Sequence, residues 1–213
     1  MNLKNLILSI LAGTFLVSCN TEKSVQTQDL RSVEGISQLE QEHTLEKESY
    51  ADSVNAGLVE DTFKGSARRE AKGSIGNADI TVNYGSPGKR GRVIWNGLVS
   101  YDQVWVSGSH WATAIDFSED VMIGDTEVTA GMYGFFTIPG REEWTLILNK
   151  VYDQHLADDY EEEEDVVRIT VTPEELEEEV QRLTYTVETE SGNHGSISLS
   201  WDKVKVSLPV RGK

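Results

Sequence analysis

The chain has 213 residues, of which 38% are hydrophobic, and its formal net charge is -17. This length suits one folded domain with flanking segments, and the apolar fraction is large enough to form a core. The charge argues against a nucleic-acid-binding function, because a polyanion requires a basic face and the Lys and Arg residues form no dense cluster.

The N-terminus has the features of an export signal followed by a cysteine. Lys4 precedes an apolar run over residues 6–17, and Cys19 follows closely. The run is too short for a membrane span, so we expect residues 1–18 to be a signal peptide. The Leu-Val-Ser-Cys sequence at residues 16–19 resembles the bacterial lipobox, which implies that Cys19 is acylated. The alternative is a plain signal peptide or an uncleaved anchor with an incidental cysteine.

Acylation of Cys19 predicts the compartment. Acyl chains on one residue anchor a chain firmly, since each buried methylene contributes about 0.8 kcal/mol. Asn20 follows the cysteine, at the position where an aspartate tends to retain enterobacterial lipoproteins in the inner membrane. We therefore expect an outer-membrane lipoprotein of the cell envelope, which faces either the periplasm or the cell surface.

Residues 19–72 are expected to be a lipidated, acidic and flexible tether. They are rich in Glu, Gln, Ser and Thr, and this composition cannot bury enough apolar surface to offset the entropy of the chain. Val33, Ile36 and Leu39 have helical spacing, but the apolar stripe fails after Leu45. Any helix in this segment is therefore marginal.

From Ile75 onward, apolar and polar residues alternate, which predicts β-strands. The expected strands are residues 80–84, 92–95, 103–107, 113–117, 121–123, 134–138, 144–149, 167–171, 183–187, 197–201 and 204–210. Gly124 and Asp125 predict a two-residue hairpin turn, and residues 192–195 join two late strands. Residues 173–180 are expected to be helical, because proline and glutamates suit the first turn of a helix.

Short strands at this spacing define the expected fold class. About nine or ten strands, with turns every 8 to 12 residues, predict an all-β fold. We expect an antiparallel β-sandwich or barrel-like domain over residues 73–213, with one short helix, after the signal peptide and the tether.

Several blocks of this region resemble the domain of unknown function 2911. They are residues 84–87, 91–95, 97–99, 104–105, 112–113, 130–139, 144–145 and 149–150. The resemblance spans residues 74–210, and the family is typical of Bacteroidetes, where its members are often exported proteins or lipoproteins. It implies no established activity. The chain departs from the family's Arg-Thr-Gly-Ala-Asn at residues 106–110, where only the glycine is kept, and from its Trp-Gly near His155.

Four polar residues are candidates for ligand binding, because they lie inside or beside the family blocks. These are Arg92, His110, Tyr133 and Lys150. Catalytic residues stay unidentified: Ser109 precedes His110, but neighbours on a strand point to opposite faces, and no nucleophile elbow is present.

No metal site and no cofactor are expected. Zinc requires three or four convergent ligands, whereas His110, His155 and His194 are scattered along the sequence. Whether these three histidines converge in space is open. The acidic run at residues 158–165 lacks the glycine of a calcium loop, and it is expected to be solvated.

Two functions are compatible with the sequence. The first is a non-catalytic module that binds a glycan, a peptide or an envelope protein, and the alternative is an envelope enzyme with a polar cleft near His110. Most tryptophans are expected in the core, Trp105 among them, and Tyr133 is expected there as well. An exposed aromatic pair would instead offer a stacking platform for a sugar or a peptide.

Overall fold

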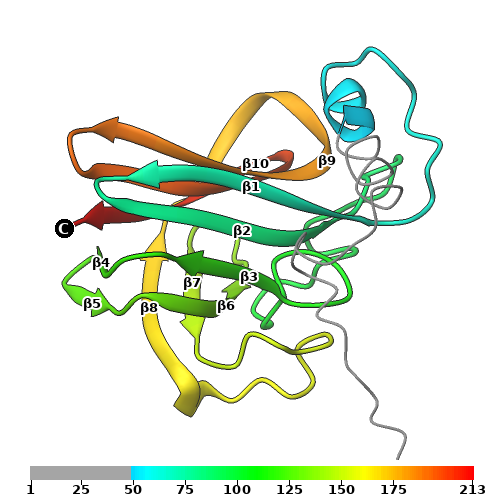
Figure 1. Cartoon of the computed structure of the whole chain (residues 1–213). Helices are drawn as coiled ribbons and strands as arrows, with labels where there is room; N and C mark the ends of the chain where they lie inside the picture. Colours follow the sequence, from blue (N-terminus) through cyan, green and yellow to red (C-terminus); the bar gives the residue numbers. More distant parts are fainter. Residues whose placement is uncertain (1–48) are drawn as a thin grey trace, which may run out of the picture. The chain divides into compact units, whose positions relative to one another are not determined.

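The computed structural model describes residues 49–213. The elements are β1 (Ala67–Ile75), β2 (Ala78–Ser86), β3 (Thr113–Phe117), β4 (Val121–Ile123), β5 (Thr126–Val128), β6 (Gly131–Ile138), β7 (Trp144–Asn149), η1 (Glu162–Glu164), β8 (Asp165–Val171), β9 (Glu174–Ser191) and β10 (His194–Gly212). They form two antiparallel sheets, in the orders β1-β2-β3-β6-β7-β8 and β5-β4-β10-β9 (Figure 1). The predicted all-β fold is confirmed, and it is a β-sandwich.

The core lies between the two sheets. One sheet contributes buried residues such as Val82, Ile115 and Leu146, and the other contributes Leu199 and Leu208. Alternation along each strand sends every second side chain inward, which is why the sequence pattern predicts these positions. The predicted bounds of β3, β4 and β7 are confirmed, as is the Gly124-Asp125 turn that joins β4 to β5.

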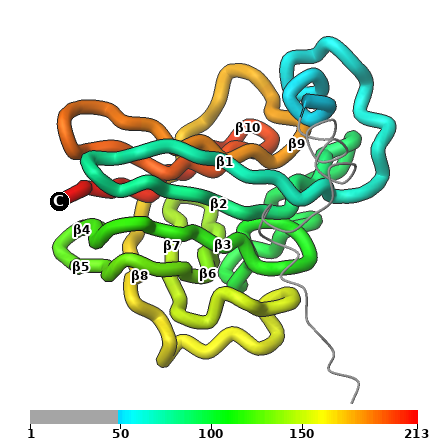
Figure 2. Tube along the Cα trace, in the orientation of Figure 1, coloured from blue at the N-terminus to red at the C-terminus, as the bar shows by residue number. Residues whose placement is uncertain are grey.

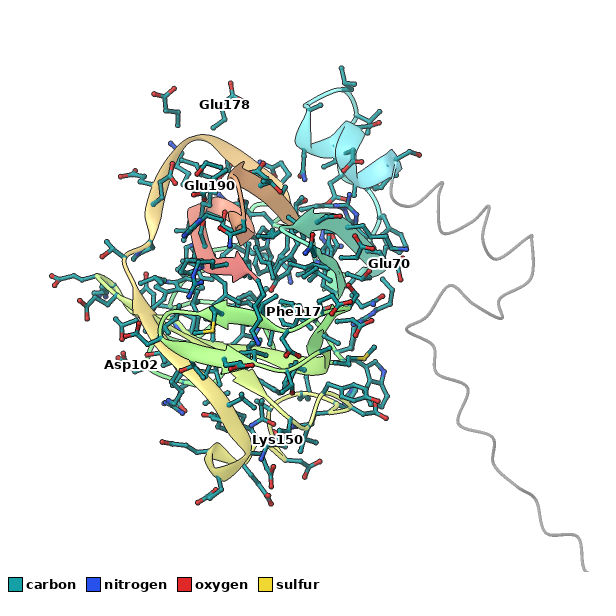
Figure 3. All side chains as sticks on the ribbon, turned by 60° about the vertical axis from the view of Figure 1, so that its left-hand side comes forward. Glu70, Asp102, Phe117, Lys150, Glu178 and Glu190 are labelled. Carbon is teal, nitrogen blue, oxygen red and sulfur yellow. The ribbon has the colours of Figure 1, made fainter. Side chains whose placement is uncertain are left out.

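The predicted helix over residues 173–180 is wrong, because these residues begin strand β9. Glu174 pairs with Lys205 of β10, and the N–H of Lys89 donates to the carbonyl of Gln181 at 2.6 Å. Pairing with a long neighbouring strand outweighs local helix propensity. Glu178 of this strand points away from the sheets in Figure 3. Strand β10 also joins two predicted strands into one, with register shifts around Asp202.

The domain begins earlier than predicted. The tether was expected to reach residue 72, yet residues 49–55 are helical and β1 starts at Ala67. Ala51 and Val54 of the helical turn are buried against the domain. The polar composition of the segment did not indicate this packing, because polar contacts also hold it. Asp61 forms a buried ion pair with Arg182, and Asn55 donates to the carbonyl of Arg182. The rest of the predicted tether, the signal peptide and Cys19 lie outside the described residues.

A long irregular connection, residues 87–112, joins β2 to β3. Strands predicted at residues 92–95 and 103–107 are replaced by turns and isolated bridges. Arg90, Asn96 and Asp102 have positive φ values, which an extended strand does not allow. Connections of this length commonly carry function in compact domains. No helix within residues 49–213 is long and apolar enough to cross a membrane.

Candidate functional site

The exposed large hydrophobic side chains of the described residues fall into two groups. One group lies on residues 58–63 and on the 93–98 turn, and the other consists of Trp111, Val151 and Leu156. The second group surrounds two histidines. We use the name Trp111 cluster for His110, Trp111, His155 and Leu156.

Aromatic rings of the Trp111 cluster contact one another at the surface. The His110 and His155 rings lie 6.3 Å apart between centroids, at 29° to each other. The Trp111 ring meets the His155 ring edge to face at 5.3 Å. Trp111 is 39% exposed, so part of the indole faces solvent while its other part packs on the imidazole. The cluster therefore combines aromatic faces with polar ring nitrogens.

Backbone hydrogen bonds fix the two loops of the cluster to each other. The N–H of Ala112 donates to the carbonyl of Gln154 at 2.9 Å, and the N–H of Leu156 donates to the carbonyl of His110 at 2.7 Å. His110 and Leu156 both have positive φ values, of 64° and 63°. Such a conformation costs free energy in residues other than glycine, and it is often found at functional sites.

The first loop rests directly on the core. A Cβ atom added to Gly85 of β2 would lie 2.5 Å from the carbonyl oxygen of Ser109, so this loop packs closely on the strand. The hydroxyl of Tyr185 donates to the carbonyl of Ser107 at 2.7 Å. Burial raises the pKa of Tyr185 well above its usual value, which keeps this donor protonated. The backbone beside the cluster is thereby tied to β9.

The second loop, residues 150–164, is closed by a polar network. Asn149 donates from Nδ2 to the carbonyl of Glu161 at 2.9 Å and to the carboxylate of Asp165 at 2.8 Å. The hydroxyl of Tyr160 donates to the same carboxylate at 2.6 Å, and Arg168 pairs with it at 2.8 Å. Burial, followed by the bond to Asp165, raises the pKa of Tyr160. The predicted acidic run is thus exposed over Glu161–Glu163 but anchored at Asp165.

Within the described residues, the side chains of the cluster form no catalytic pair. Neither imidazole hydrogen-bonds another side chain there, whereas a general base is usually oriented by a third group. The hydroxyl of Ser107 is buried and bonds Thr137 at 3.1 Å. No group of three or more metal-ligating side chains occurs among residues 49–213.

The four predicted ligand-binding residues have separate surroundings. Arg92 donates to the carbonyls of Lys89, at 3.1 Å, and Gly88. Tyr133 is buried, and its hydroxyl donates to the carbonyl of Thr129 at 2.9 Å. Lys150 lies on the loop after β7 (Figure 3) and pairs with Glu164 at 3.7 Å. Of the four, His110 belongs to the Trp111 cluster, and no contact of the described residues joins any two of them.

The structure brings two of the three histidines together. His155 lies beside His110, whereas His194 is the first residue of β10. The sequence did not single out Trp111. The sequence feature that could have indicated Trp111 is a tryptophan next to a histidine at the end of an irregular segment. The loop that it contacts follows β7, and spacing along the sequence does not predict that contact.

Most of the tryptophans pack together, as predicted. The ring centroid of Trp95 lies 4.8 Å from that of Trp144 and 5.9 Å from that of Trp201. Trp105 stacks on Trp201 with 6.2 Å between the ring centroids. Tyr133 is buried as expected, but Trp105 is only partly buried against the core. Trp111 is the tryptophan that faces solvent most.

Fold and surface together define a class of protein: an antiparallel β-sandwich with an exposed aromatic cluster on the β2–β3 connection and the loop after β7. The family model described as "Protein of unknown function (DUF2911)" matches residues 66–210, and the chain belongs to this family. The match begins just before β1 and ends within β10, so it includes both sheets. No match was found among curated proteins or among solved structures.

Proposed function

We propose that this protein is an outer-membrane lipoprotein, acylated on Cys19, whose β-sandwich is a non-catalytic module that binds a glycan, a peptide or an envelope protein. The observation that carries the binding proposal is the Trp111 cluster, in which an exposed indole packs edge to face on an imidazole and the two loops are joined by hydrogen bonds. The lipobox-like sequence before Cys19 supports the acylation.

The chemistry of the cluster favours ligand binding by stacking. Tryptophan provides a large apolar face and one N–H donor, a combination that is enriched where proteins bind partners. Two loops already held by backbone bonds lose little entropy on binding, so more of the contact free energy contributes to affinity. His110 and His155 add hydrogen-bonding nitrogens beside the indole, which suits hydroxyl groups of a sugar or amides of a peptide.

The first prediction concerns Trp111. Trp111→Ala should weaken ligand binding at least about tenfold, since truncation of a central aromatic contact commonly costs 2 kcal/mol or more. Binding is measured with the purified lipoprotein on arrays of envelope glycans and peptides, together with pulldown from detergent-solubilised envelopes. The melting temperature should stay near that of the wild type, because Trp111 is an exposed loop residue.

Leu58→Ala is the matched control for this experiment, since it removes an exposed apolar side chain outside the cluster. It should bind like the wild type. Equal retention of the same glycan, peptide or protein by wild type and Trp111→Ala would contradict the assignment of the site.

The second prediction concerns the anchor. Cys19→Ala should abolish metabolic labelling with palmitate, because the thiol is the atom that would take the lipid. The altered chain should also fractionate as an unprocessed precursor. Labelling of the variant at the level of the wild type would show that the lipid is attached elsewhere or that the lipobox-like sequence is incidental.

A further inference from the structure

The other group of exposed apolar side chains forms a second surface, distinct from the Trp111 cluster. Leu58 and Val93 are 76% and 73% exposed. Val59, Phe63 and Leu98 complete the group, and each of them is also exposed. We use the name loop face for Leu58, Val59, Phe63, Val93 and Leu98. Exposed large apolar side chains that gather on neighbouring loops are candidates for contact with a protein or a membrane.

Hydrogen bonds join the two segments that carry the loop face. Arg90 donates from Nη1 to the carbonyl of Phe63 at 3.5 Å. Arg182 donates to the carbonyl of Phe63 at 2.6 Å and to that of Ser86 at 2.9 Å, so it connects the first segment to β9 and to the end of β2, where the connection that carries Val93 and Leu98 begins. Within the second segment, the N–H of Leu98 donates to the carbonyl of Val93 at 3.0 Å. Figure 2 shows both segments, in cyan and green, on the same side of the sheets.

Unpaired cations flank the loop face. Lys64, Arg90 and Arg92 form no ion pair with a carboxylate of residues 49–213, and both arginines donate to backbone carbonyls. Residues 58–98 hold seven of the chain's 19 Lys and Arg but four of its 36 Asp and Glu. Arg69 and Lys89 are among the seven, but they pair with carboxylates outside this stretch. The basic character of the loop face therefore comes from Lys64, Arg90 and Arg92.

We propose that the loop face docks on the surface of the lipid bilayer that holds the acylated N-terminus. Apolar side chains at loop tips insert at the boundary of headgroups and acyl chains, while flanking cations meet lipid phosphates. A membrane fits this combination better than a second copy of the chain, because two locally basic faces repel each other. The proposal rests on the acylation of Cys19 proposed above.

The end of the N-terminal segment supports this orientation. Twenty-nine residues separate Cys19 from Ser49, where the described structure begins, and an extended chain of that length spans at most about 100 Å. The loop face starts soon afterwards, at Leu58. The anchor keeps the domain at high effective concentration near the bilayer, so even a weak docking contact becomes populated.

The experiment uses the full lipidated chain, in which Cys19 is blocked by its lipid and no other cysteine is present. Val93→Cys and Leu98→Cys each create one thiol on the loop face, and Leu156→Cys creates one on the Trp111 cluster as the control. Each variant is labelled with an environment-sensitive fluorophore and reconstituted into vesicles of phosphatidylethanolamine and phosphatidylglycerol that contain a spin-labelled lipid. Circular dichroism checks that each variant is folded.

Labels at positions 93 and 98 should be quenched at least about twofold more than the label at position 156, because docking places them about 5–10 Å into the interface. Equal quenching at all three positions, with one label per chain, would overturn the docking alone. Two labels per chain, detected by mass spectrometry, would show that Cys19 is unmodified and would overturn the acylation together with the docking that rests on it.

Discussion

At the scale of single residues, a further prediction concerns Arg182, which lies in the interior of the domain and is 1% exposed. Its guanidinium pairs with Asp61 at 2.7 Å, and the Asp61 side chain is 6% exposed. Tyr50 and Phe63 place their rings 5.6 and 5.1 Å from the guanidinium carbon. Arg182 thus links the N-terminal segment, the end of β2 and β9.

Arg182→Met should lower the free energy of unfolding by about 3 to 5 kcal/mol, because removal of one partner leaves the other charge buried and uncompensated. Chemical denaturation at neutral pH measures the loss. Lys72→Met is the control, since Lys72 pairs with Glu70 at 2.8 Å with its own side chain largely exposed, and such pairs contribute about 0 to 1 kcal/mol. Equal effects of the two substitutions would mean that the Arg182 pair is solvated in solution.

The sequence could not predict the role of Arg182. In a strand with alternating apolar and polar residues, an arginine is expected to face water. The alternation predicted that the neighbouring Leu183 faces the core. Its carboxylate partner, Asp61, lies in a segment whose polar composition predicts no structure. A buried ion pair between distant segments is visible only when the tertiary contacts are known.

At the scale of elements, prediction succeeded where side-chain alternation and turn chemistry agree. β3, β4 and β7 are short strands in which most residues are buried, and a two-residue turn with Gly124 at a φ of 58° follows β4. Such local signals depend on the chain within a few residues of each position.

Prediction failed where tertiary contacts decide the conformation. The glutamate-rich start of β9 has the composition of a helix, but it extends because β10 offers a strand partner along its length. In the β2–β3 connection, Asn96 and Asp102 are residue types that adopt positive φ readily, and they interrupt stretches with strand-like apolar residues. Asn96 and Asp102 therefore indicated turns, but the strand prediction gave more weight to the neighbouring apolar residues.

The candidate site shows the same limit. The sequence indicated His110, because it lies at a departure from the family pattern. It could not indicate that His155 stacks on His110, since the contact depends on the order β3-β6-β7, which brings the loop before β3 beside the loop after β7. Sites built from two loops of a sandwich become visible with the sheet order.

At the scale of the whole molecule, the two surfaces have complementary chemistry. The loop face is apolar and basic, whereas the Trp111 cluster combines aromatic rings with the nitrogen atoms of the indole and the imidazoles. The β2–β3 connection contributes residues to both surfaces, and it contacts the N-terminal segment through Arg90 and the loop after β7 through Ala112. One connection therefore positions the proposed membrane contact and the proposed ligand site on a single rigid sandwich.

The last prediction concerns the stability of the whole domain at alkaline pH. The rings of Tyr185 and Tyr84 pack with 4.8 Å between their centroids. Burial raises the pKa of Tyr185 well above the usual value of 10.0. A raised pKa in the folded state contributes stability that is fully present below about pH 10. This stability is lost as the pH rises toward the pKa of the folded state, because the tyrosine hydroxyl loses its proton first in the unfolded chain. Above about pH 10, this residue alone should lower the free energy of unfolding by about 1.4 kcal/mol for each pH unit.

Tyr185→Phe tests this explanation. At neutral pH the variant should be less stable by about 1 kcal/mol, since it loses the hydrogen bond to Ser107 but keeps the ring packing. Between about pH 10 and 11 its stability should decline less steeply than that of the wild type, so that the two curves converge. Urea denaturation at intervals from neutral to alkaline pH measures both effects. Parallel curves over the whole range would show that another group causes the alkaline loss and that the buried hydroxyl of Tyr185 does not control it.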